Sequence, residues 1–238
     1  MKKHLTLLFT CWVLGSFAQV LPTKKLTRFQ VGVSFSPDVC YRKLEKTDSS
    51  SFNDYVIDQR NEMEIPIVGY SGEVNVRYSF SRFFSMESGI QFSTKGYQTK
   101  KQNIVSFPPE PGFPTAVKYI DHFYYLDIPL KINFSAGKNK WRFVSSIGAS
   151  ANFLLNASVT QVAYYADKTD RSTSSAGYSF KKLNVTPQVS IGLDYQFTDK
   201  MSLSVEPTFR YGILKIIDSP ITGYLFTIGL NAGYYLRF

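Results

Sequence analysis

YLFTIGLNAGYYLRF, residues 224–238, ends the chain and is apolar at every second position. The apolar series is Tyr224, Phe226, Ile228, Leu230, Ala232, Tyr234, Leu236 and Phe238. The residues between them are mostly polar or glycine. A period of two predicts a β-strand whose two faces meet different surroundings. The stretch is much longer than the five or six residues of an ordinary globular strand.

A strand of about ten residues with aromatic rings at both ends is typical of a tilted transmembrane β-strand. The last positions in phase, Tyr234, Leu236 and Phe238, resemble the C-terminal signal of bacterial outer-membrane barrels. This resemblance implies that the barrel-assembly machinery recognises the final strand. It also implies that outer-membrane lipid is the solvent of the apolar face.

Seven earlier segments alternate in the same way, at residues 28–35, 72–80, 84–95, 124–134, 141–155, 183–197 and 201–211. Their connections form two groups. Residues 81–82, 135–140 and 198–200 are short and polar, whereas the connections at 42–69, 100–118, 159–182 and 218–223 are mostly long. Short turns at one end and long loops at the other are the outer-membrane pattern, with the short turns periplasmic.

The predicted fold class is therefore all-β: an eight-stranded antiparallel up-and-down transmembrane β-barrel. A soluble lipocalin-like barrel is the alternative, since it also has eight strands. Its apolar face would point inward, and it would not need aromatic residues at both ends of nearly every strand. We expect Leu126, Ile128, Ile191 and Leu230 to face lipid.

The N-terminus predicts export. A basic start (Met1 to His4), an apolar core and the cleavage site Ser16-Phe17-Ala18 indicate a Sec signal peptide at residues 1–18. Residues 19–27 are then a short periplasmic segment and residues 28–238 the barrel, so the predicted location is the bacterial outer membrane. The exported chain keeps one cysteine, Cys40, which has no partner for an internal disulfide.

Composition is consistent with one barrel domain. The chain has 238 residues, 36 of them Tyr or Phe (16 and 20), and a formal charge of +9. It contains no run of about eighteen apolar residues that would predict a membrane helix. Because the basic residues are scattered over strands and loops, the charge favours anionic lipid head groups over nucleic acid.

Charged residues on the predicted inner faces decide what the lumen can do. They are Glu73, Arg77, Glu87, Asp127, Lys131, Arg142, Asp194, Glu206, Arg210 and Arg237. An eight-stranded barrel is just wide enough for side chains to fill. We expect a packed, non-conducting ion-pair network, with Arg77 near Glu87 across the hairpin. A catalytic carboxylate pair, such as Asp194 with Glu206, is the alternative.

Two motifs resemble a family. YLDIPLK at residues 125–131, and Glu206-Pro207 followed by Phe209-Arg210-Tyr211, resemble strands of the PorT-like outer-membrane β-barrel family of Bacteroidota. The resemblance covers residues 28–238 and implies a barrel fold; the founding member takes part in type IX secretion. Prolines within predicted strands, Pro129, Pro187 and Pro207, remove backbone donors, so we expect bulges or local irregularity there.

Enzymatic motifs are lacking. His122, beside Asp121 near the predicted outer rim, is the only histidine outside the signal peptide, and the sequence contains no P-loop, no metal-ligand spacing and no G-x-S-x-G. We expect no cofactor and no catalytic or metal site. The proline-rich residues 107–114 predict a stiff loop. An interaction or assembly barrel with envelope or secretion partners is the first functional hypothesis, a surface adhesin or ligand-binding barrel the second, and a membrane hydrolase or acyltransferase the third.

Overall fold

The computed structural model describes residues 28–105, 112–177 and 179–238. The predicted signal peptide (1–18), the N-terminal segment (19–27) and most of the proline-rich loop lie outside the described residues. Within the described ranges, no helix is both long enough and apolar enough to cross a membrane.

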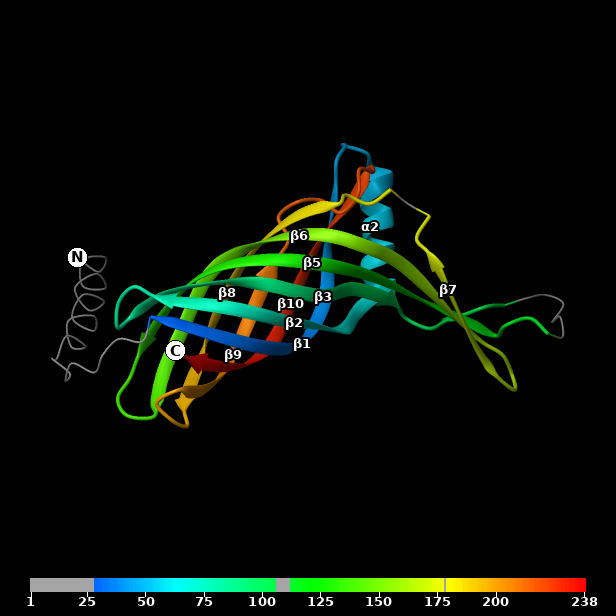
Figure 1. Ribbon diagram of the computed structural model, residues 1–238. Coiled ribbons are helices and arrows are strands. Elements are labelled where there is room, and N and C mark those ends of the chain that lie inside the picture. The colour runs from blue at the N-terminus through cyan, green and yellow to red at the C-terminus, as the bar shows by residue number, and fades with distance from the viewer. Residues whose placement is uncertain (1–27, 106–111, 178) are drawn as a thin grey trace, which may run out of the picture.

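Eight antiparallel strands close into a ring, which confirms the predicted fold class (Figure 1). They are β1 (Phe29–Lys46), β2 (Glu64–Ser79), β3 (Phe84–Thr99), β5 (Ala116–Ala136), β6 (Trp141–Tyr164), β8 (Leu183–Gln196), β9 (Met201–Tyr211) and β10 (Ile221–Arg237). The order around the ring follows the sequence, and β1 pairs with β10 to close it. Three further elements lie outside the ring: α2 (Ser51–Met63), β4 (Gln102–Asn103) and β7 (Thr169–Ser175).

The ring is apolar outside and polar inside. Val74, Ile128 and Ile191 on the outer face are 60%, 47% and 56% exposed, whereas inward residues of the same strands, such as Asn75, Asp127 and Asp194, are buried. A one-residue slip of any strand would turn its charged residues toward lipid, so the alternation also fixes the register. The amphipathic pattern read from residues 224–238 therefore extends around the whole wall.

Aromatic side chains form two girdles on the outer face. At the end that carries the short turns, Phe80 stacks on Phe84 and Trp141 packs against Tyr195. At the other end, a second row of ring contacts joins Tyr70 to Phe92, Phe92 to Tyr124, and Tyr211 to Tyr224. On β5, ten residues separate Phe134 in the first girdle from Tyr124 in the second, about 33 Å along a strand and roughly 25 Å once tilted. This is the height of the apolar band of outer-membrane barrels.

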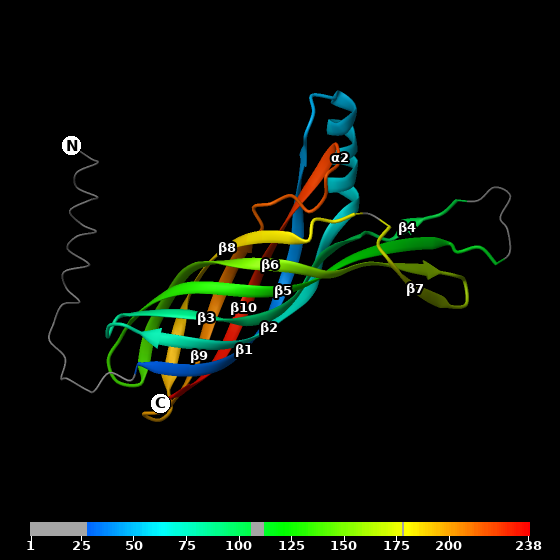
Figure 2. The same ribbon diagram turned by 45° about the horizontal axis from the view of Figure 1, so that its top comes forward.

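The long connections contain more regular structure than the sequence predicts. Residues 42–69 comprise the end of β1, the helix α2 and the start of β2, and residues 159–182 contain the end of β6 and all of β7. Likewise, β3 continues to Thr99 and β5 begins at Ala116. The alternation fades because both faces of a strand meet water beyond the membrane, whereas the backbone ladder continues. Figure 2 shows these extensions projecting past the ring, at the end away from the C-terminus.

Bulges are absent where they were predicted. The register continues unbroken past all three prolines, Pro129, Pro187 and Pro207. At Pro129 the pairing of β5 with β3 is interrupted, and at Pro207 the pairing of β9 with β8 is interrupted, without a change of register. The register shifts lie instead between Pro66 and Ser71 on β2 and between Tyr124 and Tyr125 on β5, toward the outer girdle.

Cysteine labelling tests this topology. Single cysteines at Leu126, Ile128, Ile191 and Leu230 should resist a water-soluble maleimide because these positions face lipid. Cysteines at Val105 and Ser172, in the projecting extensions, should react from outside intact cells. Labelling of a cysteine at Ser81 or Asp199 from outside would reverse the orientation, since both lie in short turns.

Candidate functional site

Glu87 lies buried in the lumen, 1% exposed, and it is shared by two cations. Its Oε2 is 2.6 Å from Arg77 Nη2, and its Oε1 is 2.5 Å from Lys131 Nζ. Lys131 also reaches Glu73 Oε2 at 3.1 Å. The Arg77 guanidinium lies 4.0 Å from the centre of the Tyr235 ring. Two carboxylates and two cations thus balance, so the buried cluster carries no net charge.

Arg77 and Glu87 lie directly opposite each other in the β2–β3 ladder. Lys131 is opposite Glu87 in the β3–β5 ladder, so three neighbouring strands deliver the three charges to one level. These positions follow from the short turn after Ser79, which fixes the hairpin register. The remaining member, Glu73, is two inward positions along β2.

A second cluster was not found from the sequence. Asp38 accepts hydrogen bonds from Ser36 Oγ at 2.7 Å and Ser71 Oγ at 3.0 Å, and pairs with Arg210 Nη1 at 3.0 Å. The signal was present, because Asp38 continues the inward phase of Ser34 on β1. Our predicted strand ended at Phe35, whereas β1 runs through Pro37 and continues to Lys46.

The other predicted luminal residues occupy separate places. Asp127 accepts from Ser93 at 2.7 Å and Asn152 at 2.6 Å, so hydroxyl and amide groups solvate this buried carboxylate. Asp194 Oδ2 lies 3.5 Å from Arg237 Nη2 near the short-turn end.

Arg142 lines the same end of the lumen, in a gap that Asp194 also borders. Glu206 accepts a 2.5 Å hydrogen bond from Ser190. The two carboxylates of the catalytic alternative, Asp194 and Glu206, therefore have different partners and do not form a dyad. No group of three metal-ligating side chains occurs in the described part of the chain.

The lumen is filled rather than open. The space between Glu87, Glu206 and Arg210 admits about one water molecule. Several buried polar atoms elsewhere in the lumen have no protein partner in the described chain, among them both amide atoms of Asn75 and Ser202 Oγ. Buried polar atoms of this kind are normally satisfied by ordered water. Isolated waters satisfy such atoms without forming a continuous aqueous path.

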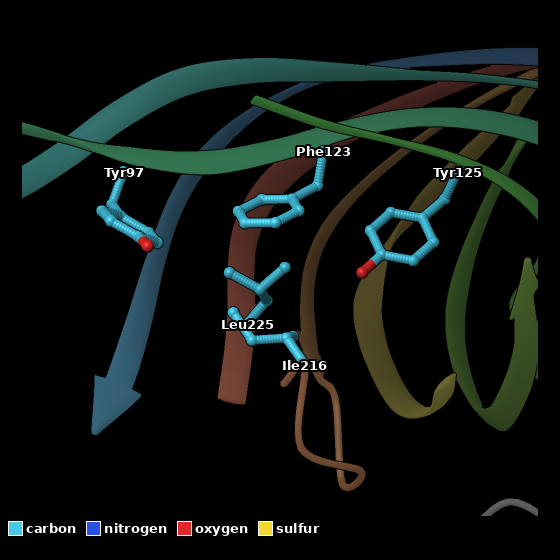
Figure 3. Packing of buried hydrophobic residues seen from close by; sticks show 5 residues of the cluster. All are labelled: Tyr97, Phe123, Tyr125, Ile216 and Leu225. Carbon is cyan, nitrogen blue, oxygen red and sulfur yellow. The ribbon is translucent and has the colours of Figure 1, made fainter. Parts of the chain in front are cut away.

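An apolar cap closes the outer end of the lumen. Its buried members are Tyr97, Phe123, Tyr125, Ile216 and Leu225. Figure 3 shows Leu225 and Ile216 facing the three aromatic rings from the opposite side of the barrel. The sequence analysis predicted only a polar lumen. All cap residues except Ile216 occupy inward positions on their strands. An apolar side chain at a position where the pattern expects a polar one was therefore the signal in the sequence.

Ile216 reaches the cap from the link between β9 and β10. Its amide donates to Gly223 O at 2.9 Å and its carbonyl accepts from Lys181 N at 2.9 Å. Beside it, Asn184 Nδ2 donates to Leu214 O at 2.9 Å. These bonds hold the link across the barrel mouth.

Beyond the cap, ion pairs hold α2 against the rim of the barrel. Glu64 accepts from Arg42 Nε at 2.7 Å and from Arg60 Nε at 2.6 Å. In the first turn of the helix, the Asn53 side chain donates to Oδ1 of the preceding Asp48 at 2.7 Å, and this bond lowers the pKa of the exposed Asp48 carboxyl. The helix is therefore an ordered part of the outer surface.

His122 and Asp121 do not cooperate. They are consecutive residues of one β-strand, so their side chains point to opposite faces of the wall. The His122 ring stacks on Tyr124, 6.1 Å between centres, as part of the outer girdle. Cys40 is fully buried and donates weakly to Thr94 O at 3.5 Å, which is a packing role.

A closed antiparallel ring with an apolar outer wall, two aromatic girdles and a polar core defines a transmembrane β-barrel of the outer-membrane class. Residues 17–218, most of the chain, match the family model of the outer membrane protein beta-barrel domain. The chain belongs to this family, which places it in the bacterial outer membrane.

Three solved structures illustrate what the chain is similar to. Neisserial surface protein A is 12% identical with a TM-score of 0.43, covering 88% of this chain and 97% of that one. OprG from Pseudomonas aeruginosa is 9% identical with a TM-score of 0.46, covering 87% and 96%. The outer membrane protease OmpT from Escherichia coli is 10% identical with a TM-score of 0.45, covering 92% and 99%. With such identities and TM-scores we draw nothing about function from them. None of the curated proteins matches the chain.

Removal of the Glu87 charge should strongly destabilise the barrel. Glu87→Gln leaves Arg77 and Lys131 facing Glu73 alone, and an uncompensated buried charge costs about 3–5 kcal/mol. Urea unfolding in detergent, followed by heat-modifiable gel mobility, measures the loss. Glu45→Gln, which breaks an exposed pair with Lys43, is the control and should change little.

A charge-balanced double variant separates charge from packing. Glu87→Gln with Lys131→Met restores neutrality to the cluster, so its destabilisation should be smaller than the sum of the two single changes. Additive losses would contradict an electrostatic origin.

Planar-bilayer recording tests the closed lumen. The ion-pair network and the apolar cap leave no continuous aqueous path, so the purified protein should show no stable single-channel openings. Steady porin-like conductance would contradict the packed lumen.

Proposed function

We propose that the protein is a non-conducting interaction or assembly component of the bacterial cell envelope, acting through its outer surface rather than through its lumen. One observation carries the proposal. The ion-pair network fills the lumen and the apolar cap covers its outer end, whereas the wall continues as ordered structure beyond the outer aromatic girdle in β1, β2, β3, β5 and β6. A transport role would require an open interior.

The outer structure has the features of a binding surface on a rigid scaffold. The β5–β6 hairpin extends eight residues past Tyr124 and gains β4 and β7 at its sides. On the other side of the mouth, α2 exposes Phe52 and Tyr55, which are 70% and 61% accessible. Aromatic residues are enriched where proteins recognise one another.

A role in PorT-like protein secretion is the finer form of this proposal. It rests on the resemblance of residues 125–131 to the strand motif of that family. Within the barrel these residues serve the wall and its core: Asp127 and Lys131 point into the lumen, while Leu126 and Ile128 face outward. The motif therefore supports the barrel type, and the partner must be sought on the outer structure.

A surface adhesin is the second candidate, supported by the same exposed extensions. It differs in needing no partner within the cell envelope. An enzymatic role has no support in the described residues, because the luminal carboxylates are bound by cations, hydroxyls or amides of the wall and His122 lies on the outer face.

Cross-linked capture from intact envelopes tests the proposal. A variant in which residues 160–173 are replaced by an Asn-Gly turn removes the tip of the β6–β7 hairpin and leaves the β6–β8 ladder of the ring intact. The native chain should capture a defined envelope protein, and the trimmed chain, still heat-modifiable, should lose it. Lys138→Ser with Lys140→Ser, in a short turn, is the matched control and should retain capture.

Two results would overturn the proposal. Native protein that captures no envelope partner, in cells whose secretion is unaffected by its deletion, would favour the adhesin. Loss of capture in the short-turn control alone would move the interface to the periplasmic side.

A further inference from the structure

β7 is the terminal strand of the sheet outside the ring. The strand order ends β8–β6–β7, so in the described part of the chain only one edge of β7 is paired. It pairs with β6 over seven consecutive residues, from Ser158↔Ser175 to Tyr164↔Thr169. Figures 1 and 2 show β7 in the part of the sheet that projects beyond the ring.

The hydrogen-bond pattern shows which residues face outward. Tyr165 N donates to Lys168 O at 2.8 Å at the hairpin turn, and Ala176 N donates to Ala157 O at 3.0 Å at the other end. In an antiparallel ladder bonded pairs recur at every second residue. The residues bonded to β6 are therefore Asp170, Ser172 and Ser174.

The alternate residues present their backbone N–H and C=O groups to the open edge. They are Thr169, Arg171, Thr173 and Ser175. The 2.9 Å contact between the hydroxyls of Thr160 and Thr173 agrees with this assignment, since side chains approach most closely in non-hydrogen-bonded pairs.

This edge has little of the usual protection: its charged residues are Asp170 and Arg171, and Asp170 is paired with Lys168. β7 (TDRSTSS) contains no proline and no lysine, its pairing has no register shift, and all seven residues are exposed. Natural sheets normally block an exposed edge with such devices, because unpaired N–H and C=O groups template the addition of another strand. Five of the seven side chains are small hydroxyls, which allow a second backbone to approach. The opposite edge of the outer sheet differs, because β4 has only two residues.

We propose that the outer edge of β7 is a docking site for an extended segment of another polypeptide, which adds as a strand of about seven residues. The proposal rests on the interaction role above and names the class of its partner. Recognition is through the backbone. The charge of Asp170 is met by Lys168 at 3.2 Å, so exposed Arg171 favours an acidic side chain on the partner.

A second copy of this chain fits the edge less well. β6 is one strand from the short turn to the tip, and β7 runs back antiparallel to it, toward the membrane. Antiparallel pairing of two identical β7 strands would turn the second barrel over relative to the first. Two barrels inserted in the same direction in one membrane cannot adopt that arrangement.

Peptide binding to the purified full-length barrel tests the site. The probe is the fluorescent heptapeptide SVTQVAY, the sequence of residues 158–164. In the native chain this segment of β6 already pairs antiparallel with the inner edge of β7. Thr173→Pro removes an outward N–H and should weaken binding about tenfold or more, equivalent to about 1.4 kcal/mol. Thr173→Ala keeps that N–H and should bind within about threefold of the native chain.

Amide hydrogen exchange locates the bound strand. The probe should slow exchange at Thr169, Arg171, Thr173 and Ser175. In the Thr173→Pro variant, the inner amides of Asp170, Ser172 and Ser174 should remain protected, which shows that β7 is still folded. A probe with proline in place of its glutamine should not bind.

Several results would overturn the docking site: no binding of the probe, equal losses for Thr173→Pro and Thr173→Ala, or protection elsewhere on the barrel. A dimer of the purified protein that Thr173→Pro dissolves would replace the foreign partner with a second copy. If Thr173→Pro leaves capture of the envelope partner intact while trimming residues 160–173 abolishes it, the edge proposal fails and the interaction role stands.

Discussion

Every backbone N–H and C=O group in the membrane must find a partner within the protein, because lipid offers none. The closing contact between β1 and β10 meets this requirement, since it removes the last free edges of the ring. Once the ring is closed, each strand has one face toward lipid and one toward the lumen. The apolar wall, the girdles and the inward charges all follow from that division.

The lumen has its own constraint, which is the cost of burying charge. Removing Glu87, Arg77 and Lys131 from water is unfavourable, and their attraction offsets this only when all partners are present. Such a cluster is better at specifying one arrangement than at adding stability, since Glu87 alone connects three strands. The apolar cap differs from this cluster, because its side chains separate the charged interior from the water outside.

The sequence predicted the parts of the fold that lie in the membrane. There, a strand must be apolar on one face, so the alternation of residues 224–238 and of seven other segments identified the wall. Asp38 was missed because the predicted first strand ended at Phe35, whereas β1 continues through Pro37, which costs only one backbone donor in a long ladder. The cap was missed because the link that carries Ile216 folds back over the mouth. Its position depends on long-range hydrogen bonds from Asn184 and Lys181. Helix α2 and strand β7 carry no membrane pattern, since water meets most of their surface.

The same physical rule explains why an open strand edge can exist here at all. Inside the membrane, an edge like that of β7 would leave four residues with unsatisfied backbone groups, each at a cost of several kcal/mol. Outside it, water satisfies those groups, and an incoming strand must only exchange water bonds for protein bonds. The net gain per bond is then small, so affinity must build up along several residues. The chain keeps a seven-residue edge without proline or lysine in water, whereas its ring has no free edge in lipid. The part of the sheet that must be closed is therefore distinct from the part that can accept another strand.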